Sequence, residues 1–99
     1  MSLQSNYTVI MKKPFLWNSE KNVLLKRERG FGFEDVVEAI DSGALLDDLP
    51  HPSDRYANLR LYVVNLDGYA ITVPYVEEED YVFLKTAFPN RQATKKYLK

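Results

Sequence analysis

The clearest pattern in the chain is the helical repeat of FEDVVEAI, which begins at Phe33. Its apolar side chains fall at positions i, i+3, i+4 and i+7, whereas its acidic residues lie elsewhere on the helical wheel. Gly43 follows as a stop signal. The pattern therefore predicts an amphipathic helix over residues 33–42.

A second helix is predicted immediately before this one. Asn18 suits the N-cap, and Glu20 lies in the first turn, where the helix dipole favours an anion. Basic residues fill the predicted last turn, and Gly30 can then adopt the left-handed conformation of a C-cap. Together these signals predict a helix over residues 18–29.

Alternating patterns toward the C-terminus predict three strands. The alternation that starts at Leu59 runs to Asp67-Gly68, a pair typical of the type I′ turn between antiparallel strands. The return strand alternates over ITVPY, and its Pro74 favours a sheet edge or a bulge. The acidic run EEED makes a second turn, and a third strand follows over residues 81–87. Because the connections are short, we expect an antiparallel meander.

The remaining segments complete the predicted topology. YTVIMKKPFLW is apolar and β-branched enough for a strand that is interrupted or ended at Pro14, whereas DDLPHPSDRYAN indicates an irregular connection. Pro89-Asn90 ends the third strand and caps a final helix that begins near Arg91. The order is β-α-α-β-β-β-α, an α+β fold with the first two helices on one face of an antiparallel sheet. The side chains expected in the core are Trp17, Phe31, Phe33, Val37, Ile40, Val63 and Ile71.

Composition narrows the possible functions. The 99 residues are enough for a single domain over 1–99, in which residues 1–5 are expected to be disordered or a cloning remnant. The chain has no cysteine and a single histidine, His51, so we expect no metal site and no other cofactor. No apolar run approaches the roughly 20 residues of a membrane span, and a cytoplasmic location is expected.

The net charge of -1 conceals a strong segregation. Residues 12–29 contain six basic and two acidic side chains, whereas residues 34–54 contain seven acidic and no basic ones. Five acidic residues follow between 67 and 80, and five basic residues between 85 and 99. Such blocks either create a bipolar surface, attractive to polyanions on one side and to a basic partner on another, or neutralise one another on folding.

Two stretches of the chain resemble a known family. FLWNSEKNVLLKRERGFGFEDVVEAI is similar to the opening of the BrnT family of bacterial toxins, in which an aromatic-x-Trp-Asp/Asn strand end leads to a Lys-Asn helix, a basic stretch with glycine and a Phe-Glu-x-Ala helix. RQATKKY resembles the terminal Arg-x-Ala-Thr-basic-basic segment of that family. The resemblance implies a RelE-like ribonuclease toxin, a cognate antitoxin encoded by a neighbouring gene, and contact with operator DNA only through that antitoxin.

Cleavage of RNA by attack of a ribose 2′-OH on its own phosphodiester needs cations that offset charge on the phosphorane-like transition state. The candidate catalytic residues are Arg60, Lys85, Arg91 and Lys95. Arg91 corresponds to the arginine of the family's Ser-Ala-Arg motif, although Pro89-Asn90 stands here in place of Ser-Ala. The alternative for Arg91 is a surface arginine that caps a carbonyl.

Other side chains could extend an RNA-binding surface, and each has a structural alternative. The candidates are Lys26, Arg27, Arg29, Arg55 and Tyr97. The three on the first helix could form a solvated face, and Arg55 could pair with Asp54 or Glu34. Tyr97 could stack on a base or pack the final helix on the sheet. His51 suits acid–base catalysis, although a loop histidine is more often simply exposed, and EEED forms a charged turn that could dock a basic antitoxin segment.

Two hypotheses follow from the sequence. In the first, the protein is an mRNA-cleaving toxin with a basic catalytic face. In the second, it is a catalytically silent relative that binds its antitoxin as a protein-binding module or transcriptional co-regulator, through the acidic segment 34–54. Convergence of the four candidate catalytic residues on one concave face favours the first hypothesis, and their dispersal favours the second.

Overall fold

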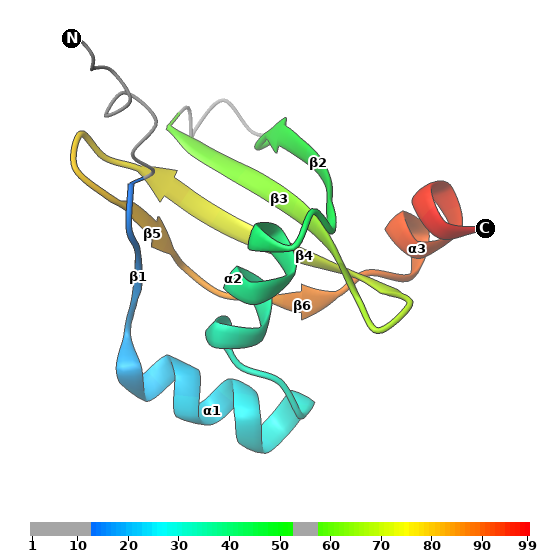
Figure 1. Cartoon of the computed structure of the whole chain (residues 1–99), viewed down its shortest axis with the longest axis horizontal. Helices are drawn as coiled ribbons and strands as arrows, with labels where there is room; N and C mark the ends of the chain where they lie inside the picture. The colour runs from blue at the N-terminus through cyan, green and yellow to red at the C-terminus, as the bar shows by residue number, and fades with distance from the viewer. Residues whose placement is uncertain (1–12, 53–57) are drawn as a thin grey trace, which may run out of the picture.

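The computed structural model describes residues 13–52 and 58–99, which combine helices with one sheet in an α+β arrangement (Figure 1). The described part contains three helices and a mixed sheet of six strands. The elements in chain order are β1 (Phe15–Trp17), α1 (Ser19–Arg29), α2 (Phe33–Asp41), β2 (Leu45–Pro50), β3 (Leu59–Leu66), β4 (Tyr69–Glu77), β5 (Val82–Leu84), β6 (Phe88–Pro89) and α3 (Arg91–Leu98).

The sheet has the order β1-β5-β4-β3-β2, and β6 pairs with β4 farther along the strand. The predicted meander is confirmed, because β3, β4 and β5 are successive antiparallel neighbours. Asp67 (φ 54°) and Gly68 (φ 87°) both have the positive φ that a type I′ turn requires. The sheet as a whole is not antiparallel, since β1 pairs parallel to β5.

The predicted irregular connection over residues 47–58 is wrong in its first part, where β2 pairs antiparallel with β3. Leu49 lies opposite Leu61, so the ladder with β3 and an apolar contact outweigh the local signals of Asp47-Asp48 and Pro50. Pro50 is tolerated because it lies at the end of an edge strand. Arg55 and the rest of 53–57 lie outside the described residues.

The sequence favoured a sheet edge or a bulge at Pro74, but Pro74 lies inside the central strand β4, where the register with β3 is regular. Its carbonyl accepts a hydrogen bond from the backbone N–H of Lys85 (2.8 Å). The backbone nitrogen and carbonyl of one strand residue point to the same side. The Pro74 nitrogen, which has no hydrogen to donate, therefore faces the gap between β5 and β6. The predicted third strand over 81–87 is accordingly shortened to β5, and β6 forms after its predicted end.

The first strand begins after Pro14. Residues 7–12 of the predicted strand lie outside the described residues, as do residues 1–5, which were expected to be disordered or a cloning remnant. The predicted α1 is confirmed with both caps. The Asn18 side chain accepts from the N–H of Lys21 (2.9 Å), and Gly30 ends the helix with φ 81°. In α2 the last helical residue is Asp41 and the C-cap is Ser42.

The two faces of the sheet are covered differently. Phe33 and Val36 of α2 pack on the face that carries Val64, Ile71 and Val73, which together form the main core. Of the described helices, α2 alone lies across this face, whereas α1 lies beside the end of β1 and reaches the core through Leu25 (Figure 1). The expectation that both helices cover the sheet is therefore only half correct, because the short β1 leads α1 past the sheet.

The predicted core residues are all at least partly buried. Phe33, Val63 and Ile71 are buried, whereas Trp17, Phe31, Val37 and Ile40 are partly buried and pack against the core. Val63 points to the other face of the sheet, toward α3, since side chains alternate along β3.

Candidate functional surface around the C-terminal helix

The helix α3 is fixed to β4 at its first turn. The Asn90 side chain accepts from the N–H of Ala93 (3.0 Å) and donates to the Thr72 hydroxyl (3.0 Å), and the Asn90 N–H donates to the Ala70 carbonyl (2.9 Å). Asn is a favoured N-cap because its side-chain oxygen satisfies a free helical N–H. One side chain therefore both starts the helix and holds it on the sheet.

Two further contacts hold the body of α3. Thr94 is buried, and its hydroxyl accepts from the Ala70 N–H (2.9 Å) while donating to the Asn90 carbonyl (2.9 Å). The Tyr97 hydroxyl donates a short hydrogen bond to a carboxylate oxygen of Asp47 on β2. This bond is the main cause that lowers the pKa of Asp47 and raises the pKa of Tyr97. Tyr97 thus anchors α3 to the sheet.

The exposed side chains of α3 divide into two groups. Arg91 and Lys95 are one turn apart and share an exposed side of the helix, as the sequence predicted. Gln92 and Lys96 form a second pair, about 100° round the helix, on the side that faces β2 and β3. The sequence analysis did not single out this second pair, although its spacing of four residues was available as a signal.

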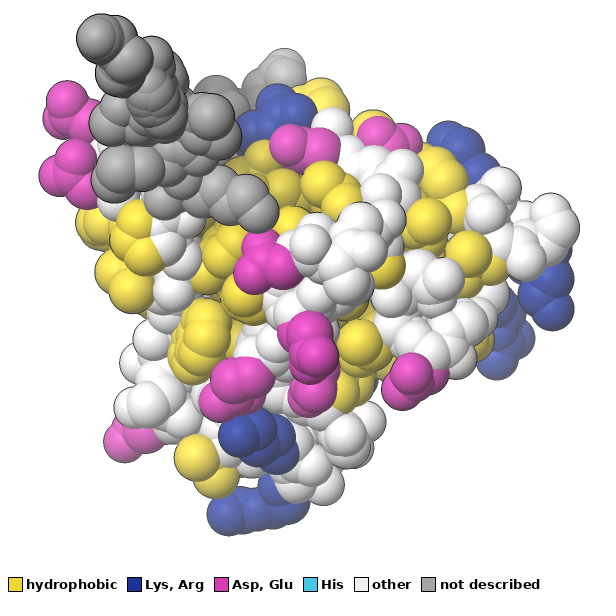
Figure 2. All heavy atoms as spheres, in the orientation of Figure 1, with side chains coloured by type: hydrophobic (Ala, Val, Ile, Leu, Met, Phe, Trp, Pro, Cys, Tyr) yellow, Lys and Arg dark blue, Asp and Glu magenta, His cyan; other side chains and the backbone are white. Residues whose placement is uncertain are grey.

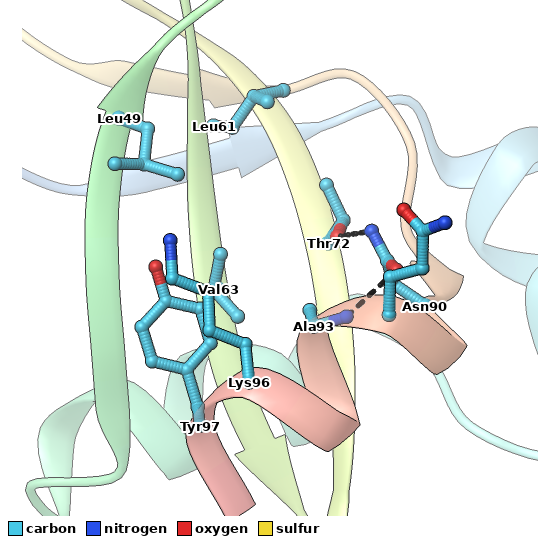
Figure 3. A pocket seen from close by; sticks show the side chains of 9 residues that line it. Leu49, Leu61, Val63, Thr72, Asn90, Ala93, Lys96 and Tyr97 are labelled. Carbon is cyan, nitrogen blue, oxygen red and sulfur yellow. Dashed lines mark hydrogen bonds between the residues drawn. The ribbon is translucent and has the colours of Figure 1, made fainter.

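A groove of about 210 Å³ runs between α3 and the neighbouring strands (Figure 3). Its lining residues are Leu49, Leu61, Val63, Thr72, Asn90, Gln92, Ala93, Lys96 and Tyr97. The floor is apolar and comes from β2 and β3, whereas the wall comes from α3. The Lys96 ammonium lies 5.3 Å from the centre of the Tyr97 ring.

Lys85 lies on the same face of the sheet as α3. It follows β5 directly, and its ammonium is 6.0 Å from the ring centre of Phe83, which alternation places on the face opposite the α2 core. The Lys85 side chain is exposed. It therefore adds a positive charge to this face.

Arg60 lies on the other face of the sheet and is held by three hydrogen bonds. Its Nε donates to Asp48 Oδ1 (3.2 Å) and to the Tyr75 hydroxyl (3.1 Å), and a terminal nitrogen donates to the Asp48 carbonyl (3.2 Å). The bond to Tyr75, followed by the charge of Asp48, raises the pKa of Arg60. The structure therefore separates Arg60 from the other three candidate catalytic residues.

Tyr75 and Tyr62 were missed by the sequence analysis. Their rings stack with centroids 3.8 Å apart, and the Tyr75 hydroxyl donates to Asp48 Oδ1 (2.6 Å). Burial is the main cause that raises the pKa of each tyrosine. The signal was present, because counting outward from the turn at Asp67-Gly68 pairs Arg60 with Tyr75.

The other predicted binding residues are dispersed. Lys26 forms an ion pair with Glu34 (3.3 Å), and a hydrogen bond from Asn22 is the main cause that lowers the pKa of Glu34. Arg27 and Arg29 are exposed on α1, on a different part of the molecule from α3. His51 is half-buried at the end of β2, where its backbone N–H donates to the Leu59 carbonyl (3.1 Å).

The charge blocks are partly neutralised. Three ion pairs join basic and acidic parts of the sequence: Lys13–Glu77 (2.8 Å), Lys26–Glu34 (3.3 Å) and Arg60–Asp48 (3.2 Å). Within residues 13–52 and 58–99, no ion pair involves the basic block 85–99. Figure 2 shows basic side chains at the α3 end and on α1, with acidic side chains between them over α2.

No group of three or more His, Cys, Asp or Glu side chains in the described residues is arranged to hold a metal ion. In the same residues, no helix combines the length and apolar character needed to cross a membrane.

Comparisons with protein-family models, curated proteins and solved structures found no match to this chain. Functional inference therefore depends on the surface chemistry of α3 and of the sheet face beside it.

Proposed function

We propose that this protein is the toxin of a toxin–antitoxin pair and cleaves mRNA, with α3 as its contact to RNA phosphate. The observation that carries the proposal is the pair Arg91 and Lys95, which share an exposed side of α3 and belong to the basic block that makes no ion pair in the described part of the chain. Charges that are not paired within the fold are available to a polyanion.

The chemistry assigned to this surface uses the RNA as its own nucleophile. The ribose 2′-oxygen forms a bond to the adjacent phosphorus, the bond to the 5′-oxygen breaks, and the proton lost by the 2′-OH is balanced by one gained at the leaving oxygen. Arg91 binds two phosphate oxygens through its planar fork, and Lys95 offsets the charge that develops on them. Lys85 contacts a flanking phosphate, whereas Arg60 has no part in this assignment.

The test compares Arg91→Ala and Arg91→Lys with the matched control Arg27→Ala. Arg27 is an exposed arginine on α1, which lies away from α3, and it has no part in the site proposed here. Removal of a group that stabilises transition-state charge typically costs on the order of 100-fold or more in rate. We expect that loss in both Arg91 variants, because lysine cannot supply the bidentate contact, and little change in the control. Readouts are growth arrest, cleavage of single-stranded RNA and circular dichroism. Full cleavage by folded Arg91→Ala protein would remove Arg91 from the site.

A second candidate function is favoured by the position of Arg60. Its separation from Arg91 and Lys95 matches the dispersal expected of a catalytically silent relative that acts by binding its antitoxin. In that case the wild-type protein cleaves no RNA, yet forms a complex with the product of the neighbouring gene. The acidic segment 34–54 is the predicted contact, and a complex through it should weaken with added salt.

A further inference from the structure

The sheet face opposite α2 is only partly covered. Register and alternation place the side chains of this face in transverse rows, and α3 covers the row that contains Val63 and Thr72. The next row contains Leu49, Leu61 and Pro74. The row beyond contains Leu59, Val76, Phe83 and Leu16. These seven residues of the second and third rows are named here the open apolar face.

All seven side chains retain solvent exposure within the described structure. Leu16 is 44% exposed, and Leu49, Leu61, Val76 and Phe83 are half-buried. A contiguous apolar patch of this kind on a small domain marks an interaction site more often than isolated exposed residues do. The groove beside α3 continues directly into this patch, because Leu49 and Leu61 belong to both.

The charged residues beside the open apolar face include two lysines. Lys96 lies in the wall of the groove, and Figure 3 shows its side chain beside the Tyr97 ring. Lys85 lies next to Phe83 on the other side of the patch. No acidic side chain in the described ranges forms an ion pair with either lysine. Asp47 on β2 is the acidic neighbour of Lys96, whose charge contributes, after the Tyr97 hydrogen bond, to the lowered pKa of Asp47. An apolar patch flanked by two lysines is complementary to an amphipathic segment with acidic borders.

Two observations decide which kind of segment fits. The outer edge of β2 is poorly suited to pairing with another strand. The Asp48 N–H already donates a hydrogen bond to Asp47 Oδ1 (2.8 Å), and Pro50 has no N–H. The face itself contains aliphatic residues and proline, with Phe83 as its one aromatic side chain. Addition of a strand at β2 and stacking of RNA bases are both disfavoured, whereas a helix can lie on the face.

We propose that the open apolar face binds an acidic amphipathic helix of a second protein. The helix lies beside α3, places apolar side chains over Leu61 and Val76, and directs carboxylates toward Lys85 and Lys96. The proposal does not depend on RNA cleavage, because Arg91 and Lys95 lie on another side of α3 and Lys96 is not assigned to RNA. Lys85 borders both surfaces, so Lys96 is the lysine that distinguishes them. Four inter-strand spacings of about 4.8 Å correspond to roughly 13 helical residues at 1.5 Å each, so a probe of that length can span the sheet.

The probe is a synthetic helical peptide with leucines at i, i+3, i+4 and i+7 and glutamates beside them, and the matched peptide has lysine in place of every glutamate. Binding to the full chain labelled with ¹⁵N is followed by nuclear magnetic resonance. We expect the glutamate peptide to shift the amide signals of β3, β4 and β5 near the patch. The lysine peptide should bind at least about ten-fold more weakly, because like charges meet at Lys85 and Lys96.

Two variants and a control locate the site. Leu61→Asp and Lys96→Glu should each weaken binding of the glutamate peptide, roughly ten-fold or more for Leu61→Asp as a change at the centre of the contact. Lys96→Glu alters an exposed side chain, so it keeps the test valid if Leu61→Asp does not fold. The control is Val23→Asp, which changes an apolar residue of α1 that is already 54% exposed. The control should bind like the wild type.

Four results would overturn the proposal. The first is equal affinity for the two peptides, and the second is a set of amide shifts confined to α1 and α2. The third is self-association of the chain into a dimer that Leu61→Asp abolishes. The fourth is displacement of the peptide by single-stranded RNA, with shifts at Phe83. The third result would identify a second copy as the occupant, and the fourth would identify RNA. Retained RNA cleavage in a peptide-deficient Lys96→Glu protein would show that the two surfaces act separately.

Discussion

At the scale of single residues, Tyr75 is a buried polar group with two hydrogen-bond partners. The residue is 1% exposed and its ring stacks on Tyr62, while its hydroxyl lies between Asp48 and Arg60. A buried hydroxyl must find partners, since an unpaired one would cost free energy. Asp48 and Arg60 are about 41% and 39% exposed, so solvent screens their charges. The cluster therefore mainly orients β2 on β3 and contributes no large electrostatic stabilisation.

Tyr75→Phe should lower the free energy of unfolding by about 1 kcal/mol, the typical net value of one hydrogen bond. Tyr75→Leu should cost more, because it also removes the stack on Tyr62, worth about 0.5–1.5 kcal/mol beyond burial. Urea denaturation measures both changes. Tyr81→Phe is the matched control and should be neutral. Equal stability of Tyr75→Phe and the wild type would mean that the hydroxyl contributes nothing net.

The contact between Tyr97 and Asp47 makes the anchoring of α3 dependent on pH. Because folding lowers the pKa of Asp47, its contribution to stability is complete above the ordinary aspartate range and is lost as pH falls through the lowered value. Tyr97→Phe should raise the pKa of Asp47 and speed amide exchange in α3. Titration of the Asp47 carboxyl by ¹³C resonance measures the pKa. Identical midpoints in wild type and variant would contradict this account of the shift.

At the scale of elements, the junction between α1 and α2 depends on Gly32. Its backbone is extended (φ -123°), so conformation alone does not require glycine. An added Cβ would lie 2.7 Å from Asn22 Oδ1 and 2.6 Å from Lys26 Cε. The lysine can move, but Asn22 is 7% exposed and its Oδ1 accepts from the Phe33 N–H (2.7 Å). Position 32 therefore requires glycine because the Asn22 side chain approaches its Cα closely.

Gly32→Ala should therefore destabilise the domain by about 1–3 kcal/mol, as overpacking typically does. The loss of stability caused by Gly32→Ala should be smaller in an Asn22→Ala background, because the clash with the amide is gone. A double-mutant cycle measured by urea denaturation gives the coupling energy between the two positions. Additive effects of the two substitutions would show that the asparagine is not the obstacle. Gly30→Ala is a useful comparison because its cost comes from backbone strain at φ 81°, with no atom near the added Cβ.

At the scale of the whole molecule, β1 joins the N-terminal helix pair to the far edge of the sheet. Trp17 ends β1 and stacks on Phe33 of α2, with ring centroids 5.6 Å apart. It is the single tryptophan of the chain. Its fluorescence therefore reports on the junction of sheet, α1 and α2.

Unfolding followed by Trp17 fluorescence should coincide with unfolding followed by far-ultraviolet circular dichroism. The reason is that one core contains residues of α1, α2 and the sheet, and a small domain with one core usually unfolds in a single transition. Urea titration with both probes is the measurement. A fluorescence midpoint at lower urea would mean that β1 and α1 separate from the sheet first.

The predictable part of the fold consists of signals that act over a few residues. The helix caps at Asn18, Gly30 and Asn90 and the turn at Asp67-Gly68 form as expected. Each of these residues either provides a hydrogen bond to a nearby backbone group or adopts the positive φ that the local backbone requires. The pairing of Arg91 with Lys95 on one side of α3 likewise follows from helical spacing alone. These features were available before any tertiary contact was known.

The tertiary structure decided the features that depend on distant partners. β2 forms although its sequence favours a loop, because β3 offers backbone partners and an apolar contact. Arg60 is removed from the candidate site because strand register gives it Asp48 and Tyr75. The groove and the open apolar face exist because α3 covers one row of the sheet and leaves the next two uncovered. Local propensity specifies where elements begin and end, whereas packing over long sequence distances determines which side chains share a face.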